Sequence, residues 1–149
     1  MTTWSDFAAA APELAGFGER RLEKRIAYLA TSRADGSPRV HPVSPFRARG
    51  RLFLYMEPTS PKRRDLLRDP RYALHCAVED SSGGQGEFLI RGRAEEVPDP
   101  QIRASAFEQA QRLGYQPKER YVLFELSVEE AMSTTYPDGE PRRMKWKAG

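Results

Sequence analysis

Cysteine and histidine are scarce in this chain of 149 residues, which has one cysteine, Cys76, and two histidines, His41 and His75. A single cysteine excludes an intramolecular disulfide framework. Three such side chains are also too few for a Cys/His zinc site, so no metal site is expected. Cys76 and His75 lie in the apolar segment 72–78, which is typical of a buried strand. We interpret Cys76 as a packed core thiol and His75 as a structural residue.

Long hydrophobic runs are also absent. No apolar stretch approaches the roughly 20 residues that a membrane-spanning helix needs. Residues 1–6 lack the basic region of a signal peptide. We therefore expect a cytoplasmic protein with no membrane partner. The hydrophobic content of 39% and charged content of 30% suit a single globular domain over residues 1–149.

A strong excess of one charge is missing too. The chain has 24 Lys and Arg residues against 21 Asp and Glu residues, a net charge of +3, and the two signs are interleaved. The sequence pI of about 9.2 is compatible with nucleic-acid binding. The net charge is nevertheless small for a dedicated DNA-binding protein, and no helix-turn-helix or RNA-recognition motif is present. We expect no nucleic-acid partner.

The order of local patterns predicts short strands joined mostly by hairpins. Strands are expected at 26–32, 38–46, 51–56, 72–79, 87–97 and 121–127, and a final hairpin-like piece turns at 137–139. Helices are expected at 5–25 with a break at Pro12, at 61–68, and at 99–113 with one packed face formed by Ile102, Ala106, Phe107, Ala110 and Leu113. Because helical crossovers are few, this pattern favours a single mainly β, α+β domain built on a small antiparallel barrel over a Rossmann sheet.

The second strand carries prolines at 38, 42 and 45. Proline has no N–H to donate to a β-ladder, so this strand is expected at a sheet edge, at a bulge, or against a ligand. An Asp-Gly turn at 35–36 joins it to the first strand.

The segment 57–66 is a hydroxyl-rich turn that runs directly into positive charge, and it follows the apolar strand 51–56. Between Ser60 and Arg71 there are five basic residues and two acidic ones. The first N–H groups of a helix are unpaired, and the helix dipole favours negative charge there. The segment therefore predicts an anion site, with a phosphate as the expected ligand.

Several motifs follow one another in an order that is similar to a known family. They are Pro38-Arg39-Val40-His41-Pro42-Val43 after the Asp-Gly turn, Tyr55-Met56, Ser60-x-Lys62-x-x-Asp65-Leu66, Asp69-Pro70-Arg71-Tyr72-Ala73-Leu74, and Ile90-Arg91-Gly92-Arg93-Ala94. Over roughly residues 12–130, this order resembles the pyridoxamine 5′-phosphate oxidase-like, FMN-binding split-barrel superfamily.

The resemblance implies a six-stranded antiparallel split β-barrel with peripheral helices, which forms a homodimer with the flavin at the subunit interface. By position, Arg39, Ser60 and Lys62 would hold the flavin phosphate. The backbone of Val40, His41, Tyr55 and Met56 would border the isoalloxazine ring and the ribityl chain. The catalytic residues are left unassigned.

The sequence departs from the oxidase itself at two points. The oxidase has an arginine between the serine and the lysine, where this chain has Pro61, so Arg63 or Arg64 is expected to take that place. The basic and aromatic segment 142–146 does not align with the oxidase tail that recognises pyridoxal phosphate. The resemblance therefore implies the superfamily and not that enzyme.

These patterns lead to one functional hypothesis and two alternatives. The hypothesis is an FMN-binding oxidoreductase that acts on a small-molecule substrate of unknown identity. The first alternative is an F420-dependent reductase of the same fold, since the chain has spare arginines for a longer phosphate-bearing tail. The second is a non-enzymatic haem- or flavin-binding protein, in which His41 or His75 would ligate haem iron. His41 could also serve as an acid or base, although a packed strand histidine is the commoner role.

Overall fold

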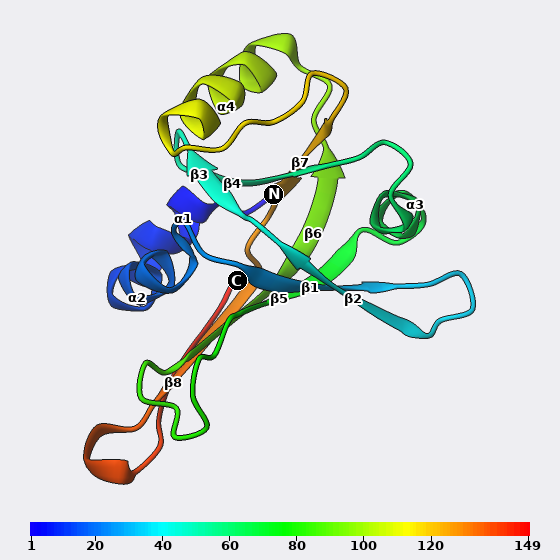
Figure 1. The fold of residues 1–149 in the computed structure, drawn as a ribbon. Helices are drawn as coiled ribbons and strands as arrows, with labels where there is room; N and C mark the ends of the chain where they lie inside the picture. Colours follow the sequence, from blue (N-terminus) through cyan, green and yellow to red (C-terminus); the bar gives the residue numbers. More distant parts are fainter.

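Nine β-strands form one continuous antiparallel sheet in the computed structural model, which describes residues 1–149 (Figure 1). The strands are β1 (Ala27–Ser32), β2 (Pro38–Val43), β3 (Phe46–Ala48), β4 (Arg51–Met56), β5 (Arg71–Cys76), β6 (Glu87–Glu96), β7 (Val122–Leu126), β8 (Glu130–Thr135) and β9 (Arg142–Lys147). The helices are α1 (Trp4–Ala10), α2 (Pro12–Leu22), α3 (Pro61–Arg68) and α4 (Pro100–Arg112), with a 3₁₀ turn, η1 (Pro137–Gly139).

The sheet curls around the long strand β6. Its strand order is β2-β1-β5-β6-β7-β4-β3, and β8 pairs with β6 and β9. Residues 87–93 of β6 pair with β5 or β8, whereas its last three residues, 94–96, pair with β7. The strand β6 thus belongs to two parts of the sheet, and the sheet bends between them. The result is a half-barrel. This confirms the expected mainly β, α+β split-barrel class.

The strands follow the expected order, with one expected strand divided in two. The expected strand 38–46 is divided into β2 and β3 at Ser44 and Pro45, because a proline interrupts the ladder there. The strands β8 and β9 form the hairpin expected around the turn at 137–139. As the prolines suggested, β2 lies at one edge of the sheet, where it pairs only with β1.

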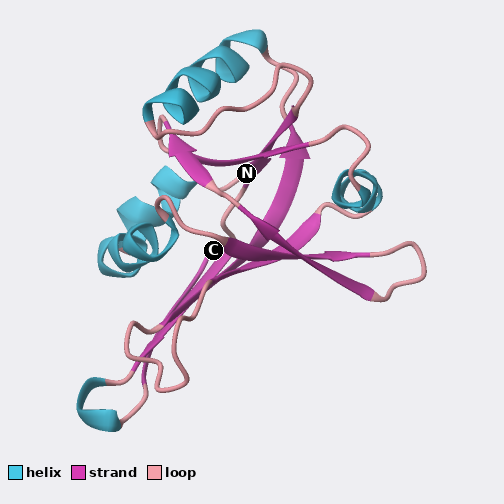
Figure 2. Ribbon diagram, viewed as in Figure 1, coloured by secondary structure: helices cyan, strands magenta, loops and turns pink.

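The main core lies inside the curve of the sheet, beneath α1 and α2 (Figure 2). Trp4 and Phe7 of α1 are fully buried and pack edge to face, with ring centroids 5.2 Å apart. In α2, Gly18 lies directly against Phe88 of β6, so a Cβ atom at position 18 would come within 2.3 Å of the phenyl ring. The core therefore depends on a glycine at this helix–sheet contact.

A smaller core lies between α4 and the strands β3, β4 and β7. Ala106 and Ala110 of α4 are fully buried in it, as expected. The prediction that Phe107 shares this buried face was wrong, because its side chain is 37% exposed. Successive residues of an α-helix lie about 100° apart around the axis, so a neighbour of Ala106 turns away from the sheet.

The helix α3 connects β4 to β5 and packs against β1 and β6. It covers residues 61–68, as predicted, since Pro61 suits the first helical turn and Asp69-Pro70 ends the helix. In Figure 1, α3 lies beside the β1–β2 hairpin, at the other end of the sheet from α1 and α2, and its Leu66 shares the main core with them. The β8–β9 hairpin projects away from the body of the domain. No helix is both long and apolar enough to cross a membrane.

Candidate functional site

Lys62, in the first turn of α3, has a half-buried ammonium group with an unusual environment. Its Nζ donates a hydrogen bond to the hydroxyl of Ser60 at 3.0 Å. Ser60 is only 8% exposed, and its side chain does not cap the helix that it precedes. Burial alone lowers the pKa of Lys62, because no carboxylate lies close enough to oppose that shift. A partly desolvated cation with one neutral partner is suited to binding an anion.

Arg39 of β2 is brought to α3 by Asp65. The carboxylate of Asp65, 3% exposed, accepts hydrogen bonds from Arg39 Nε at 2.7 Å and from the hydroxyl of Thr31 at 2.8 Å. Arg68 donates a third at 3.1 Å. Burial would raise the pKa of Asp65, but these three hydrogen bonds outweigh it and lower the pKa. Asp65 is therefore a buried carboxylate that fixes two guanidinium groups.

His41 lies on the same face of the sheet as Leu29, its direct partner on β1. Its pKa is lowered, first by burial and then by the positive charges of Lys62 and Arg39, with Asp65 opposing them. The imidazole is thus neutral at physiological pH, with one N–H donor and one acceptor nitrogen. The neighbouring Val40 points to the opposite face, where it is 62% exposed.

Arg63 does not join this group. Its guanidinium binds both carboxylate oxygens of Glu96 on β6, at 2.8 and 3.3 Å, and also the carbonyl oxygen of Pro58 at 3.2 Å. A side chain with two-point pairing to a carboxylate has little capacity for a further anion. Met56 is buried in the main core, so only its backbone is available to a ligand.

A groove of about 300 Å³ opens beside Lys62. It is lined by Pro42, Val43, Ser44, Phe46, Tyr55, Lys62, Tyr115, Gln116, Pro117 and Tyr121. Its aromatic rings contact one another: Phe46 stacks on Tyr55, with centroids 5.4 Å apart and planes 13° from parallel, and Tyr55 lies 6.5 Å from Tyr121. Burial raises the pKa values of Tyr55 and Tyr115, so both phenols are neutral donors. An aromatic groove that adjoins a cation suits a planar ligand carrying an anionic group.

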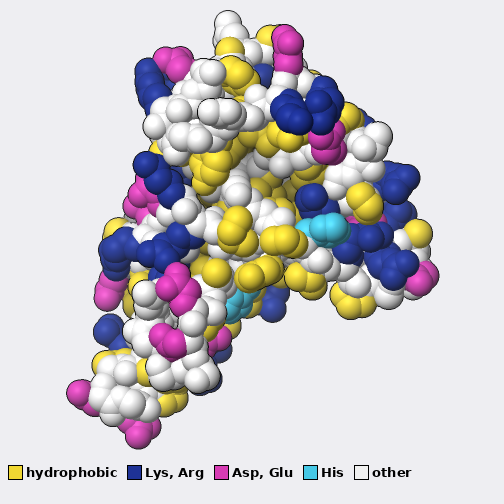
Figure 3. Space-filling model, viewed as in Figure 1, with side chains coloured by type: hydrophobic (Ala, Val, Ile, Leu, Met, Phe, Trp, Pro, Cys, Tyr) yellow, Lys and Arg dark blue, Asp and Glu magenta, His cyan; other side chains and the backbone are white.

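The structure thus brings Lys62 to Ser60 and places His41 near the charges of both Lys62 and Arg39. Tyr55 lines the groove together with Lys62. Thr31, Asp65 and Arg68 support this group. Sequence reasoning assigned them no role, although Asp65 stood in the motif that follows Ser60. Tyr115 and Tyr121 were also missed, and no local pattern marks them. In Figure 3, Lys and Arg side chains gather over α3 and the β1–β2 hairpin.

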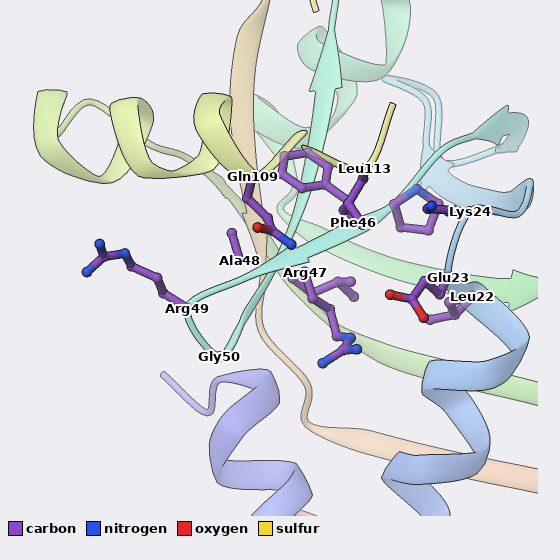
Figure 4. Close-up of a pocket in the computed structure, with 12 residues that line it drawn as sticks. Leu22, Glu23, Lys24, Phe46, Arg47, Ala48, Arg49, Gly50, Gln109 and Leu113 are labelled. Atoms are coloured by element: carbon purple, nitrogen blue, oxygen red, sulfur yellow. The ribbon is translucent and has the colours of Figure 1, made fainter. Parts of the chain in front are cut away.

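A second cavity, of about 240 Å³, lies between the end of α2, the strand β3 and α4 (Figure 4). Phe46 lines both this cavity and the aromatic groove. Arg47 forms a salt bridge to Glu19 of α2 at 3.3 Å, and Arg49 points away from the cavity. None of the predicted cofactor-binding residues lines this cavity. We therefore place the candidate site in the groove beside Lys62.

Comparison with known proteins establishes the family. The family model for pyridoxamine 5′-phosphate oxidase matches residues 15–142. The chain therefore belongs to the pyridoxamine 5′-phosphate oxidase family, as the ordered motifs indicated. No curated protein matches the sequence.

Solved structures share the fold at low sequence identity. A heme binding protein from Mycobacterium smegmatis has a TM-score of 0.66 and 18% identity, over 88% of this chain and 57% of that one. This chain thus spans little more than half the length of that protein. A NimC/NimA family protein from Clostridium acetobutylicum has a TM-score of 0.64 and 18% identity, over 89% and 92%. PhzG from Burkholderia lata 383, solved with tetrahydrophenazine-1-carboxylic acid, has a TM-score of 0.65 and 17% identity, over 98% and 88%.

Proposed function

We propose that this protein is an FMN-binding oxidoreductase that holds the flavin phosphate between Arg39, Ser60 and Lys62. The observation that carries the proposal is the half-buried ammonium of Lys62, whose one hydrogen-bond partner is a buried hydroxyl and which has no carboxylate partner. A phosphate dianion at this position would supply the missing counter-charge.

The side chains around Lys62 offer several hydrogen-bond donors, two of them charged, as a phosphate group requires. Lys62 offers an ammonium, Ser60 a hydroxyl, and Arg39 the terminal nitrogens that its bond to Asp65 leaves unused. The start of α3 adds a favourable dipole. Arg63, the expected substitute for the missing arginine, is paired with Glu96, so this proposal does not include it.

The residues of the aromatic groove are likewise suited to binding a flavin ring. Phe46 and Tyr55 offer a stacked apolar wall, and neutral His41 offers a hydrogen-bond donor or acceptor close to Lys62. When bound, the flavin would supply hydride and electron transfer. The roles of this chain are to hold the phosphate, to orient the ring and to limit the access of water. The substrate is a small molecule whose identity these residues do not define.

We further propose that the protein is a homodimer whose second copy closes this groove. The face of the sheet opposite to His41 exposes apolar side chains beside the groove, with Val40 62% and Tyr28 44% exposed. Tyr28 pairs directly with Pro42, and Ala30 with Val40, so these residues form one continuous apolar surface across β1 and β2. A surface of this kind on a soluble domain is typical of a protein–protein interface.

Two other cofactors remain alternatives, F420 and haem, the latter because a structural relative is a heme binding protein. His41 pairs with Leu29, whereas His75 pairs with Tyr28, so the two histidines point to opposite faces of the sheet. They therefore do not provide two ligands to one haem from the same chain. A haem in this groove would rely on His41 alone.

The direct test is reconstitution. The purified protein is titrated separately with FMN, F420 and haem, and binding is followed by absorbance and by calorimetry. We expect saturable binding of one FMN per chain. Saturable binding of F420 or haem without binding of FMN would replace the flavin proposal by the corresponding alternative. A protein that takes up none of the three would contradict the assignment of the groove as a cofactor site.

A further inference from the structure

A second concentration of positive charge lies beyond Arg39, between the β1–β2 turn and the outer side of α3. We call it the arginine pocket. It has a volume of about 320 Å³ and is lined by Arg33, Arg39, Arg64 and Arg68, with Ala34, Asp35, Pro61 and Asp65. The positive side chains that gather over α3 and this hairpin in Figure 3 belong to the same region.

Much of this charge has no partner within the chain. Arg33 and Arg64 are exposed, and neither has a carboxylate oxygen within the 4.0 Å of a salt bridge. The carboxylate of Asp35 already accepts hydrogen bonds from the backbone N–H and the hydroxyl of Ser37. Asp65 is occupied by Arg39 and Arg68. Four arginines therefore line one pocket with two aspartates, and both carboxylates already accept hydrogen bonds.

Two of the four guanidinium groups are held in fixed positions. Arg39 uses only Nε to bind Asp65, so its two terminal nitrogens can be shared between this pocket and the flavin phosphate. Arg68 binds Asp65 and the carbonyl oxygen of Ser32 through one terminal nitrogen, at 3.1 and 3.0 Å, and its other nitrogens are free. A guanidinium whose orientation is already set loses less conformational entropy when it binds an oxyanion.

The arginine pocket is a neighbour of the proposed flavin phosphate site, although it shares no lining residue with the aromatic groove. Arg39 lines the pocket and also belongs to the group around Lys62. Pro61, directly before Lys62, forms part of the pocket wall. The first turn of α3 therefore contributes to both sites, through Pro61 to the pocket and through Lys62 to the groove. One extended ligand or two adjacent ligands could occupy both.

We propose that the arginine pocket is a second anion subsite, which binds a phosphate or carboxylate group distinct from the phosphate held at Lys62. This inference rests on the proposed cofactor site and extends it: the ligands of this protein carry two separated anionic groups. The second group belongs either to the far end of a cofactor longer than FMN or to an anionic substrate. The chemistry of recognition is the same in both cases.

The test uses the double variant Arg33→Ala/Arg64→Ala, which removes the two unpaired and exposed arginines. The matched control, Arg112→Ala/Arg142→Ala, removes two exposed arginines far from α3. Inorganic phosphate is titrated into the FMN-loaded protein by calorimetry. We expect one saturable site in the wild type and in the control. In the double variant its affinity should fall about 10- to 100-fold, while the affinity for FMN falls much less.

The source of the anion is identified by two further ligands, FAD and F420, which extend beyond the phosphate of FMN. If the pocket holds the far end of a cofactor, one of them binds more tightly than FMN and displaces inorganic phosphate, and the double variant loses this preference. If the pocket holds a group of the substrate, inorganic phosphate stays bound beside the cofactor and neither longer cofactor is preferred.

Three results would overturn the proposal: no phosphate binding to the FMN-loaded wild type, unchanged binding in the double variant, or a loss of FMN affinity in the double variant as large as that in Lys62→Ala. The last would mean that a single site extends over both groups. Failure of the flavin proposal alone would give another result. The wild type would then bind no FMN, while the unloaded protein would still bind phosphate through Arg33 and Arg64.

Discussion

Arg39 and Asp65, which are 26 residues apart in the sequence, form a salt bridge of 2.7 Å that connects the edge strand β2 to α3. Asp65 is nearly inaccessible, whereas Arg39 keeps its terminal nitrogens free. A buried carboxylate thus sets the position of a cation at the border of two candidate anion sites. This relationship makes Asp65 a positioning residue rather than a ligand.

Replacement of Asp65 by asparagine should destabilise the protein and also weaken FMN binding. Asparagine keeps the shape but loses the charge that Arg39 and Arg68 pair with, and the loss of such charged hydrogen bonds costs about 1.5–3 kcal/mol each. Urea unfolding measures the stability change. Asp138→Asn, in an exposed turn, is the control. Equal stabilities of Asp65→Asn and wild type would contradict this role.

The same variant has a defined pH dependence. The pKa of Asp65 is lowered in the folded state, so its contribution to stability is present above the ordinary carboxylate range and is lost as the pH falls through the lowered pKa. The stability difference between wild type and Asp65→Asn should therefore shrink in acid. If the difference in unfolding free energy between the two proteins is the same at pH 7 and at acid pH, the charge of Asp65 does not stabilise the fold.

The pKa values of the two histidines should be shifted in opposite directions from that of a free imidazole. Contacts with Cys76, first through its side chain, raise the pKa of His75 to about 9, and Glu87 adds to the shift. Burial, followed by Lys62 and Arg39, lowers the pKa of His41 below the ordinary value of 6.5. NMR titration of the imidazole protons resolves the two residues, and His75→Gln assigns the signals. Two midpoints near 6.5 would contradict both environments.

For His75, this shift also predicts a change in stability. A raised pKa means that its contribution is fully present below pH 6.5 and is lost as the pH rises through about 9. Unfolding of the wild type and of His75→Gln, compared at pH 6 and pH 9.5, should show a larger difference at pH 6. The reverse order would exclude a stabilising imidazolium at this position.

The contact between Gly18 and Phe88 offers a test of the packing with an internal control. Alanine at position 18 would place Cβ 2.3 Å from the ring, and such overpacking costs about 1–3 kcal/mol. Gly16 lies in the same helix, and the nearest atom to its added Cβ is the end of Arg20 at 3.7 Å. Gly16→Ala should therefore be neutral or slightly stabilising. Equal thermal unfolding temperatures of the two variants would contradict the close approach of α2 to β6.

The proposed dimer is tested by a charge in the apolar surface of β1 and β2. Val40→Asp should shift the protein to monomers, because an unpaired carboxylate would be buried in the interface. Leu67 is exposed on α3, away from this surface, so Leu67→Asp is the matched control. Sedimentation velocity measures the oligomeric state. A wild-type monomer, or a Val40→Asp protein that stays dimeric, would contradict the interface.

Local signals were sufficient to predict much of the fold. Pro61 and Asp69-Pro70 delimit α3 without any tertiary information, and the prolines of 38–45 mark an edge strand. The division of the expected strand 38–46 into β2 and β3 was not predicted, although β3 pairs with the adjacent strand β4. A strand of three residues is too short for a local pattern to separate it from its neighbour.

The candidate site was predictable in part. The residue types expected for a phosphate stood in the motifs around Arg39 and Lys62, and the structure brings them close together. The pairing of Arg63 with Glu96 and the anchoring of Arg39 by Asp65 could not be read from the sequence. These contacts join residues that are 33 and 26 positions apart in the chain. The family of the chain was also visible from the order of the motifs.

The central claim, that Lys62 binds the phosphate of a flavin, is tested most directly by comparing FMN with riboflavin, which lacks the phosphate. Calorimetry or flavin fluorescence gives the affinity of the wild type, of Lys62→Ala, and of Lys145→Ala, which removes an exposed lysine on β9. We expect Lys62→Ala to weaken FMN about 10- to 100-fold and to leave riboflavin nearly unchanged, with no effect of Lys145→Ala. An equal loss for FMN and riboflavin, or no loss for either, would contradict the claim.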